Sequence, residues 1–190
     1  MSWTPDRDAA LALLHEYTSG ESLRRHAYAV DAAVRGYARR LGEDEALWGV
    51  TALLHDFDYE RWPSLEDHPY RGVEILKQQG YPEVVTRAIL SHADYSGVTR
   101  DSPLEKVLYA CDEMSGFVTA AALVRPSRSV MDLEAASVRK RMKDKAFARA
   151  VPREDLERGA ALIGLPLEQH IANVIESLRE EADALGLRGV

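Results

Sequence analysis

The chain has little of the chemistry that defines several common classes of protein. Cys111 is its only cysteine, so no disulfide can form within the chain and a cysteine-based structural zinc site is excluded. No apolar run approaches the ~20 residues that a membrane-spanning helix needs. Residues 1–6 lack the basic-then-apolar pattern of a secretory signal. We therefore expect a cytoplasmic protein that does not enter a membrane.

Positive charge is also scarce. The chain has 24 Lys and Arg against 31 Asp and Glu, which gives a formal net charge of −7. We therefore expect no stable binding of nucleic acid, which normally requires a basic surface. A small anionic substrate stays open, because a metal ion or a few local cations can reverse the field inside a pocket. The G-x-S-x-G, P-loop, dinucleotide-binding and H-E-x-x-H motifs are absent as well.

Hydrophobic periodicity predicts an all-α protein. Apolar residues recur at a spacing near 3.6 between residues 23 and 41, and Gly42 marks the end of that helix. Ser102-Pro103-Leu104-Glu105 is the clearest start signal, with serine as cap, proline first and glutamate completing a capping box. The expected helices cover 5–18 (capped by Thr4), 23–41, 43–56, 69–79, 82–92, 103–124, 130–144, 152–163 and 166–185.

Three side chains of types that commonly bind metals lie on the apolar faces of predicted helices. His26 lies in the stripe of its helix, and His92 follows Val85 and Ile89 on the inward face of another. Asp112 lies four residues after Leu108, and a buried aspartate is uncommon unless it is paired or metal-bound. Each histidine alone is more often a hydrogen-bonded core residue, but three such positions together favour a metal centre.

The dipeptide His55-Asp56 stands where an apolar helix ends. Two metal ligands in consecutive positions are costly to bury without a partner. His68 precedes Pro69 at the start of a short helix, from where a loop could deliver it to the same site. The remaining histidines, His15 and His170, lack such a pattern and are expected to be structural or surface residues. Cys111 is expected to be an inert buried thiol.

The order His26, His55-Asp56, Asp112 resembles the HD superfamily of metal-dependent phosphohydrolases, which is all-helical and named after that dipeptide. His68 and His92 look like the two extra histidines of its binuclear members. The segments 25–30, 54–60 and 140–147 are similar to those of small bacterial predicted HD hydrolases, an HDIG-related group. Tyr59 stands where cyclic-dinucleotide phosphodiesterases of the superfamily have a lysine, so a cyclic dinucleotide is not favoured as substrate.

The resemblance implies a ligand set and a reaction. His26, His55, Asp56 and Asp112 would hold one ion, and Asp56 would bridge to a second ion on His68 and His92. This donor set suits Mn, Fe, Co, Ni or Zn better than Mg or Ca. Metal-activated water would then attack the phosphorus of a small phosphate ester or nucleotide, with Asp56 and Asp58 as the candidate catalytic residues. Asp58 and Glu113, beside the ligands, are expected to orient water or a ligand nitrogen.

Basic residues near these motifs are candidates for binding the anionic substrate. Arg25 is adjacent to His26, and Lys140 and Lys143 share a helix face in a basic stretch. A solvated helix face is the commoner explanation of such a stretch. Two other functions stay open, namely a di-iron oxygenase of the same superfamily and a metal-stabilised binding module without turnover.

The domain organisation is expected to be simple. We predict one helical domain over residues 1–190, with a metal-binding core at about 19–125 and C-terminal helices at about 128–186 packed on it. The sequence leaves the oligomeric state open, homo-oligomers included.

Overall fold

The computed structural model describes residues 3–189, and this part of the chain is helical with no β-strand. The predicted all-α class is confirmed. Met1, Ser2 and Val190, at the ends of the predicted domain, lie outside the described residues. None of the described helices is long and apolar enough to cross a membrane. The elements are α1 (Arg7–Tyr17), α2 (Glu21–Leu41), α3 (Glu45–Leu53), α4 (Tyr70–Gln78), α5 (Glu83–His92), the 3-10 turn η1 (Asp94–Ser96), α6 (Pro103–Leu123), α7 (Ala135–Met142), α8 (Arg153–Leu162) and α9 (Leu167–Glu180).

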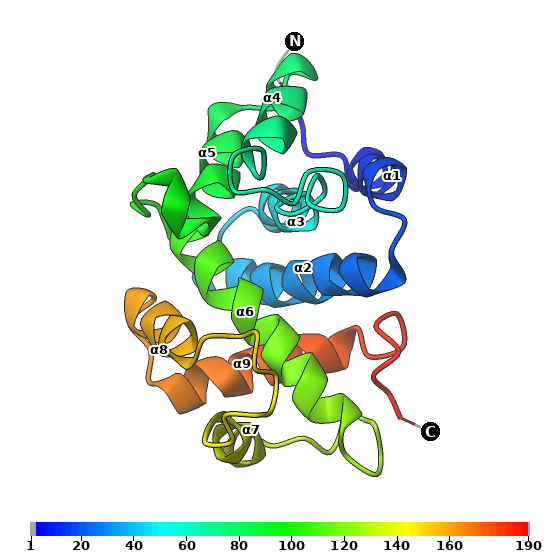
Figure 1. The fold of residues 1–190 in the computed structure, drawn as a ribbon, viewed down its shortest axis with the longest axis vertical. Helices are drawn as coiled ribbons and strands as arrows, with labels where there is room; N and C mark the ends of the chain where they lie inside the picture. The colour runs from blue at the N-terminus through cyan, green and yellow to red at the C-terminus, as the bar shows by residue number, and fades with distance from the viewer. Residues whose placement is uncertain (1–2, 190) are drawn as a thin grey trace.

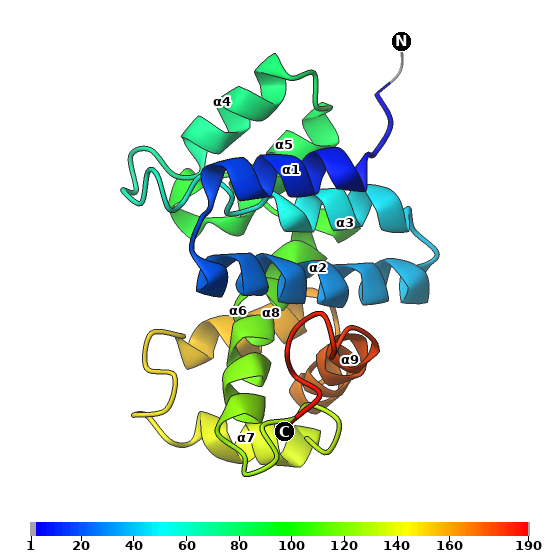
Figure 2. The ribbon, with the colours of Figure 1, turned by 90° about the vertical axis from the view of Figure 1, so that its right-hand side faces the viewer.

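Helix α2 crosses the middle of the molecule and separates two groups of helices (Figures 1 and 2). Helices α1, α3, α4 and α5 lie on one side of it, and α7, α8 and α9 lie on the other. Helix α6 runs across α2 and joins the two groups, packing against α2, α5, α8 and α9. The two long helices α2 and α6 therefore form the frame on which the other helices pack.

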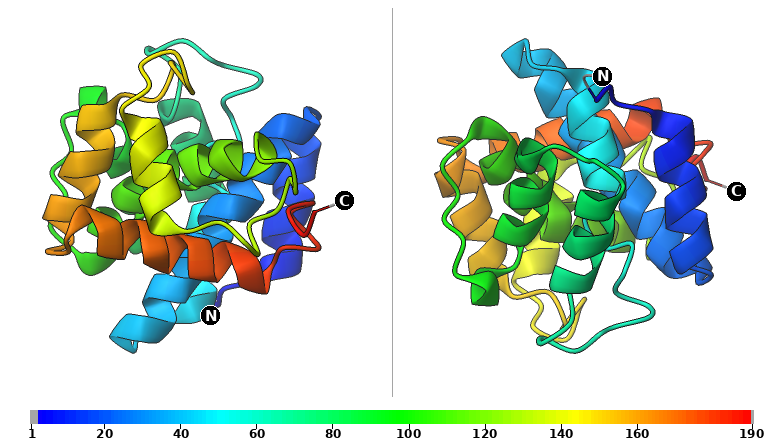
Figure 3. Two further views of the ribbon diagram at one scale, coloured as in Figure 1. Left: turned by 90° about the horizontal axis from the view of Figure 1, so that it is seen from below. Right: turned by 90° about the horizontal axis from the view of Figure 1, so that it is seen from above.

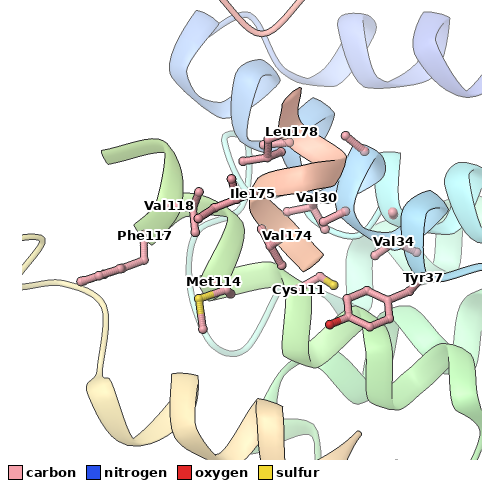
Figure 4. Close-up of a cluster of buried hydrophobic side chains, with 14 of the residues drawn as sticks. Val30, Val34, Tyr37, Cys111, Met114, Phe117, Val118, Val174, Ile175 and Leu178 are labelled. Carbon is pink, nitrogen blue, oxygen red and sulfur yellow. The ribbon is translucent and has the colours of Figure 1, made fainter. Parts of the chain in front are cut away.

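Two buried hydrophobic clusters follow from this arrangement. The α2/α6/α9 core includes Val34, Val118 and Ile175 (Figure 4), and the α1/α3/α5 core includes Leu14 and Ile89. Four of the six predicted metal ligands, His26, His55, Asp56 and Asp112, are direct chain neighbours of residues in these cores. The neighbouring core residues are Ala27, Leu54, Phe57 and Cys111.

The strongest capping signals of the sequence are confirmed. The Ser102 Oγ accepts from the backbone N–H of Glu105 at 3.3 Å, and the Glu105 carboxylate accepts from the N–H of Ser102 at 2.9 Å. This reciprocal pair satisfies two of the free donors at the start of α6. Gly42 ends α2 with φ 71°, a left-handed conformation that glycine adopts without steric cost.

Contacts in the structure explain four of the predicted helix boundaries that are wrong. Helix α1 begins at Arg7, because the Asp6 carboxylate accepts from the N–H of Ala9 and replaces Thr4 as the cap. Helix α3 ends at Leu53 rather than at the His55-Asp56 pair, and residues 54–61 form successive turns. Consecutive side chains on a regular helix diverge by about 100°. The turn after α3 lets both side chains of the dipeptide reach one site.

The other two boundaries were set by contacts between distant segments. The helix expected over 130–144 covers only Ala135–Met142, because the N–H of Val130 bonds to the carbonyl of Leu187 at 2.8 Å. The helix expected over 166–185 ends at Glu180, and the chain then turns so that Leu185 and Leu187 enter the core. Hydrophobic periodicity alone does not report such contacts.

Candidate metal centre and substrate pocket

The structure brings all six predicted metal ligands together in two groups of three. The candidate ligand atoms within each group lie within 4.8 Å of one another. The first trio is His26, His55 and Asp112, and the second trio is Asp56, His68 and His92.

Five separate segments deliver these side chains. His26 comes from α2 and Asp112 from α6, the two helices that cross at the centre of the molecule. His92 is the last residue of α5. His55 and Asp56 lie in the turns after α3, and His68 lies in the turn just before α4.

Asp56 lies between the two trios. Its Oδ1 is 3.3 Å from Nε2 of His68 and 3.2 Å from Nε2 of His92, and its Oδ2 is 3.4 Å from Nε2 of His55. The same His55 nitrogen is 3.4 Å from Oδ1 of Asp112. One carboxylate therefore faces both trios, as a carboxylate that bridges two ions would.

Hydrogen bonds to the backbone set the orientation of two ligand histidines. The Nδ1 of His55 lies 2.7 Å from the carbonyl oxygen of Ala52, and the Nδ1 of His92 lies 2.5 Å from that of Ile89. A carbonyl can only accept, so in both rings Nδ1 donates and, in the neutral ring, Nε2 keeps its lone pair. Those lone pairs point into the site.

Asp58 sets the orientation of a third ligand histidine, His68. Its Oδ1 accepts from Nδ1 of His68 at 2.8 Å, and its Oδ2 accepts from the N–H of Gly72 at 2.8 Å. Asp58 is only 1% exposed, so it does not reach a substrate in the pocket. Its position supports the predicted orienting role and argues against a direct catalytic one.

The residues fit a divalent cation. The buried Nε2 of His55 and the buried Oδ1 of Asp56 have no hydrogen-bond partner in the described part of the chain. Each unpartnered buried polar atom costs about 1–3 kcal/mol. A cation between the lone pairs and the carboxylate oxygens would satisfy both atoms, and a mixed imidazole and carboxylate set is typical of transition-metal sites.

The electrostatics of the site also favour a cation. Burial alone would lower the pKa of His55, but the carboxylates of Asp56 and Asp112 raise it well above its usual value. The pKa of His68 rises to about 9 because Asp56 and Asp58 outweigh the effect of burial. Burial would raise the pKa of Asp56, yet the adjacent His55 holds it well below its usual range. The site therefore stabilises positive charge, carried by protons or by metal ions.

A cavity of about 630 Å³ opens onto both trios. The connection between α3 and α4 contributes Leu65 to its lining, and the loop between α7 and α8 contributes Ala150 and Val151. Both loops project from the same side of the molecule (Figures 2 and 3). The described residues that line the cavity include several acids and no lysine or arginine, so positive charge for an anion would come from the histidines, through protons or bound metal ions.

A family model for the HD domain matches residues 23–116. This segment contains all six residues of the two trios. The chain belongs to the HD superfamily. HD domains bind divalent metals and are typically metal-dependent hydrolases. No curated protein and no solved structure is detectably similar to the chain.

The wall formed by Ala150, Val151 and Asp155 lies beyond the matched segment, so the C-terminal helices complete the pocket of this HD domain, which we call the HD pocket.

The structure does not bring the predicted substrate-binding cations to this pocket. The guanidinium of Arg25 pairs with Glu21 at 2.9 Å and faces a neighbouring groove. Lys140 lines a separate cavity between α6 and α7, and Lys143 caps the end of α7. None of the three lines the HD pocket, so their predicted role is not supported by their positions.

Three tyrosines line the HD pocket, and sequence analysis did not select them as site residues. The Tyr95 hydroxyl donates to the backbone carbonyl of His68 at 3.0 Å. The guanidinium carbon of Arg100 lies 3.6 Å from the centroid of the Tyr109 ring. Only Tyr59, which packs edge-on against His68, had a signal in the sequence through its closeness to the His-Asp dipeptide.

Proposed function

We propose that the chain is a metal-dependent phosphohydrolase that acts on a small phosphate ester or nucleotide. The observation that carries this proposal is the position of Asp56, whose carboxylate lies between the two ligand trios and lines the cavity. Its Oδ1 and the Nε2 of His55 are buried without a hydrogen-bond partner in the described residues. A cavity of about 630 Å³ is in the range of small-molecule sites. Membership of the HD superfamily supports the same reaction class.

Each ligand has a stated role in this proposal. His26, His55, Asp56 and Asp112 would hold one ion, and Asp56, His68 and His92 would hold a second. When bound, the ions supply Lewis acidity, which makes water a nucleophile near neutral pH and offsets the charge on the phosphoryl oxygens. Candidate ions are Mn, Fe, Co, Ni and Zn.

The protein's own residues orient the ligand histidines, and the acids of the pocket wall make anion binding depend on the metal. Asp58 keeps the proton of His68 on Nδ1, so that Nε2 remains a ligand atom. The backbone carbonyls of Ala52 and Ile89 do the same for His55 and His92. Because the pocket wall is acidic, we expect an anionic substrate to bind more tightly to the metal-loaded protein than to the metal-free one. This dependence separates a metal-dependent hydrolase from an enzyme that binds phosphate through arginine or lysine.

The test combines metal analysis with a substrate panel. The protein is purified without a histidine tag, its metal content is measured by elemental analysis, and phosphate esters and nucleotides are screened with added Mn, Co or Ni. We expect bound transition metal and release of phosphate from part of the panel. Asp56→Ala should abolish both, and Glu74→Ala, at an exposed acid of α4, should preserve both.

Three outcomes would contradict the proposal. Tightly held iron with a mixed-valent signal and no phosphate release would indicate an oxygenase. Full metal occupancy without turnover across the panel would indicate a binding module. Full metal occupancy in Asp56→Ala would show that the metal site itself is wrong.

A further inference from the structure

A second cavity, of about 580 Å³, adjoins the HD pocket between α2 and α6. Leu23 and His26 line both cavities, so the two meet at these side chains. The floor of the second cavity is made of small residues, Ala29 and Gly116 among them, and Leu123 forms part of its wall. We call this cavity the α2/α6 groove.

His26 connects the groove to the candidate metal centre. Its Nε2 is hydrogen-bonded to Asp112 at 3.0 Å. Its Nδ1 lies 3.8 Å from the position that a Cβ on Gly116 would occupy, and both residues line the groove. Glycine at position 116 therefore leaves space beside the free edge of this ring.

The Nδ1 of His26 differs from that of the other ligand histidines. His55, His68 and His92 all have a protein acceptor for Nδ1. For His26, residues 3–189 provide no hydrogen-bond partner at Nδ1, although a metal-bound histidine almost always donates from its second nitrogen. A molecule in the groove would fill this gap if it carried an oxygen acceptor.

The groove favours an uncharged and mainly apolar occupant. Its wall includes Leu123, a large apolar side chain that is 38% exposed. The charged pair at its rim, Arg25 and Glu21, neutralises itself at 2.9 Å. The buried Oγ1 of Thr119, another lining residue, has no partner in the described residues and could bind one polar atom.

We propose that the α2/α6 groove binds the organic part of the substrate, and that the substrate is a phosphate monoester with an extended, mainly apolar group such as an alkyl or acyl chain. The phosphate would lie in the HD pocket, and the chain would pass Leu23 and His26 into the groove. This inference rests on the proposed function, because it takes the phosphate to be at the metal centre. The shared side chains of the two cavities favour one continuous ligand over a separate partner.

The test uses alkylphosphonates, which cannot be hydrolysed, so that binding is measured apart from turnover. Methyl- to hexylphosphonate are titrated by calorimetry into the Mn-loaded protein. Burial of each added methylene should tighten binding by roughly fourfold. Ala120→Trp should remove this dependence while leaving the affinity for methylphosphonate unchanged, because position 120 lines only the groove. Lys106→Trp, on α6 outside both cavities, is the matched control and should behave like the wild type.

A second variant guards against misfolding of Ala120→Trp. Gly116→Ala introduces a methyl group whose nearest neighbour is His26 Nδ1 at 3.8 Å, an ordinary contact, so the fold should tolerate it. It should weaken hexylphosphonate binding by roughly fourfold, the effect of one displaced methylene. Thermal unfolding of each variant shows whether it is folded.

The outcomes separate this inference from the proposed function. Failure of the wild-type protein to bind any phosphonate would overturn the proposed phosphate site and this inference with it. An affinity that does not change with chain length would overturn the groove assignment alone. Equal chain-length dependence in wild type and both groove variants would overturn it too. Binding that depends on chain length, without hydrolysis of the matching phosphate esters, would sustain the groove and reject the hydrolase.

Discussion

Asp58 accepts two hydrogen bonds and is buried, so a change of one atom should affect the metal centre. In Asp58→Asn, the amide group would face either the N–H of Gly72 or the Nδ1–H of His68, and one donor would lose its acceptor. We expect about a 10- to 100-fold loss of metal affinity. Competition with a chelator measures it. Asp67→Asn is the control, because the Asp67 carboxylate in the same connection bonds to Ser64 and Arg71 and to none of the ligand side chains. Equal affinity in the two variants would mean that His68 needs no orientation by Asp58.

His170 is a buried histidine outside the metal centre. Its Nε2 donates to the carbonyl of Ala110 at 2.8 Å, and its Nδ1 accepts from the Tyr37 hydroxyl at 2.6 Å. Burial lowers its pKa to about 4 from the ordinary value of 6.5. The neutral ring is therefore part of the contact between α9, α2 and α6.

This shifted pKa predicts how stability depends on pH. Between pH 6.5 and about 4 the unfolded chain binds a proton at His170 and the folded chain does not. Stability from this residue is therefore complete above pH 6.5 and falls as the pH drops towards 4, by roughly 2–3 kcal/mol. Urea unfolding of wild type and His170→Gln at pH 7 and pH 5 measures it, since the difference between the two proteins cancels the other histidines. An identical pH dependence in both would contradict the assignment.

Five of the six candidate ligands were predictable because each leaves a mark in its own segment, whereas His68 was selected only through the others. His26, His92 and Asp112 lie on apolar faces, and His55-Asp56 ends an apolar run. The distances between helices leave no such mark, so adjacency in sequence did not show that Arg25 lines the neighbouring groove and not the HD pocket. His170 was expected to be a structural or surface residue. Its buried structural role could not be read from its own helix, because its partners come from α2 and α6.

Helix α8 approaches α6 so closely that only glycine fits at one position. A Cβ on Gly159 would lie 2.9 Å from the Cα of Ala110, a backbone atom that cannot move aside. Gly159→Ala should therefore destabilise the protein by roughly 1–3 kcal/mol despite the better helix propensity of alanine. Gly116→Ala, also inside a helix but without a clash, should stabilise it by up to about 1 kcal/mol. Urea unfolding compares the two, and a shift of the same sign in both would refute the packing argument.

Helix boundaries divide in the same way between local and distant causes. The starts and ends fixed by neighbouring residues, such as Ser102 with Glu105 or Gly42, were predicted. The late start of α7 was not, because a bond from Val130 to Leu187 holds the preceding segment out of the helix. The sequence also did not predict that the loop between α7 and α8 lines the pocket, because this loop reaches the site only in the folded molecule.

The C-terminal helices α7 to α9 lie outside the segment that matches the HD domain, yet they share its core. Val174 and Ile175 of α9 pack with Val30 and Val118 in the α2/α6/α9 core (Figure 4). We therefore infer that the chain folds as one unit and not as an HD domain with an independent appendage. The pocket is complete only when the α7–α8 loop is present, because this loop forms part of the cavity wall.

A truncated chain tests this inference. A fragment of residues 1–126 would expose four core side chains of α2 and α6, namely Val34, Met114, Phe117 and Val118. Losing their burial removes roughly 6–12 kcal/mol, at about 1.5–3 kcal/mol each. This loss is comparable to the entire stability of an ordinary domain, about 5–15 kcal/mol. We expect the fragment to show no cooperative unfolding transition in urea, followed by circular dichroism. Addition of a fragment of residues 127–190 should restore the transition, because the missing half of the core returns with α9. A fragment 1–126 that unfolds cooperatively at the midpoint of the full chain would show instead that the HD segment is stable alone.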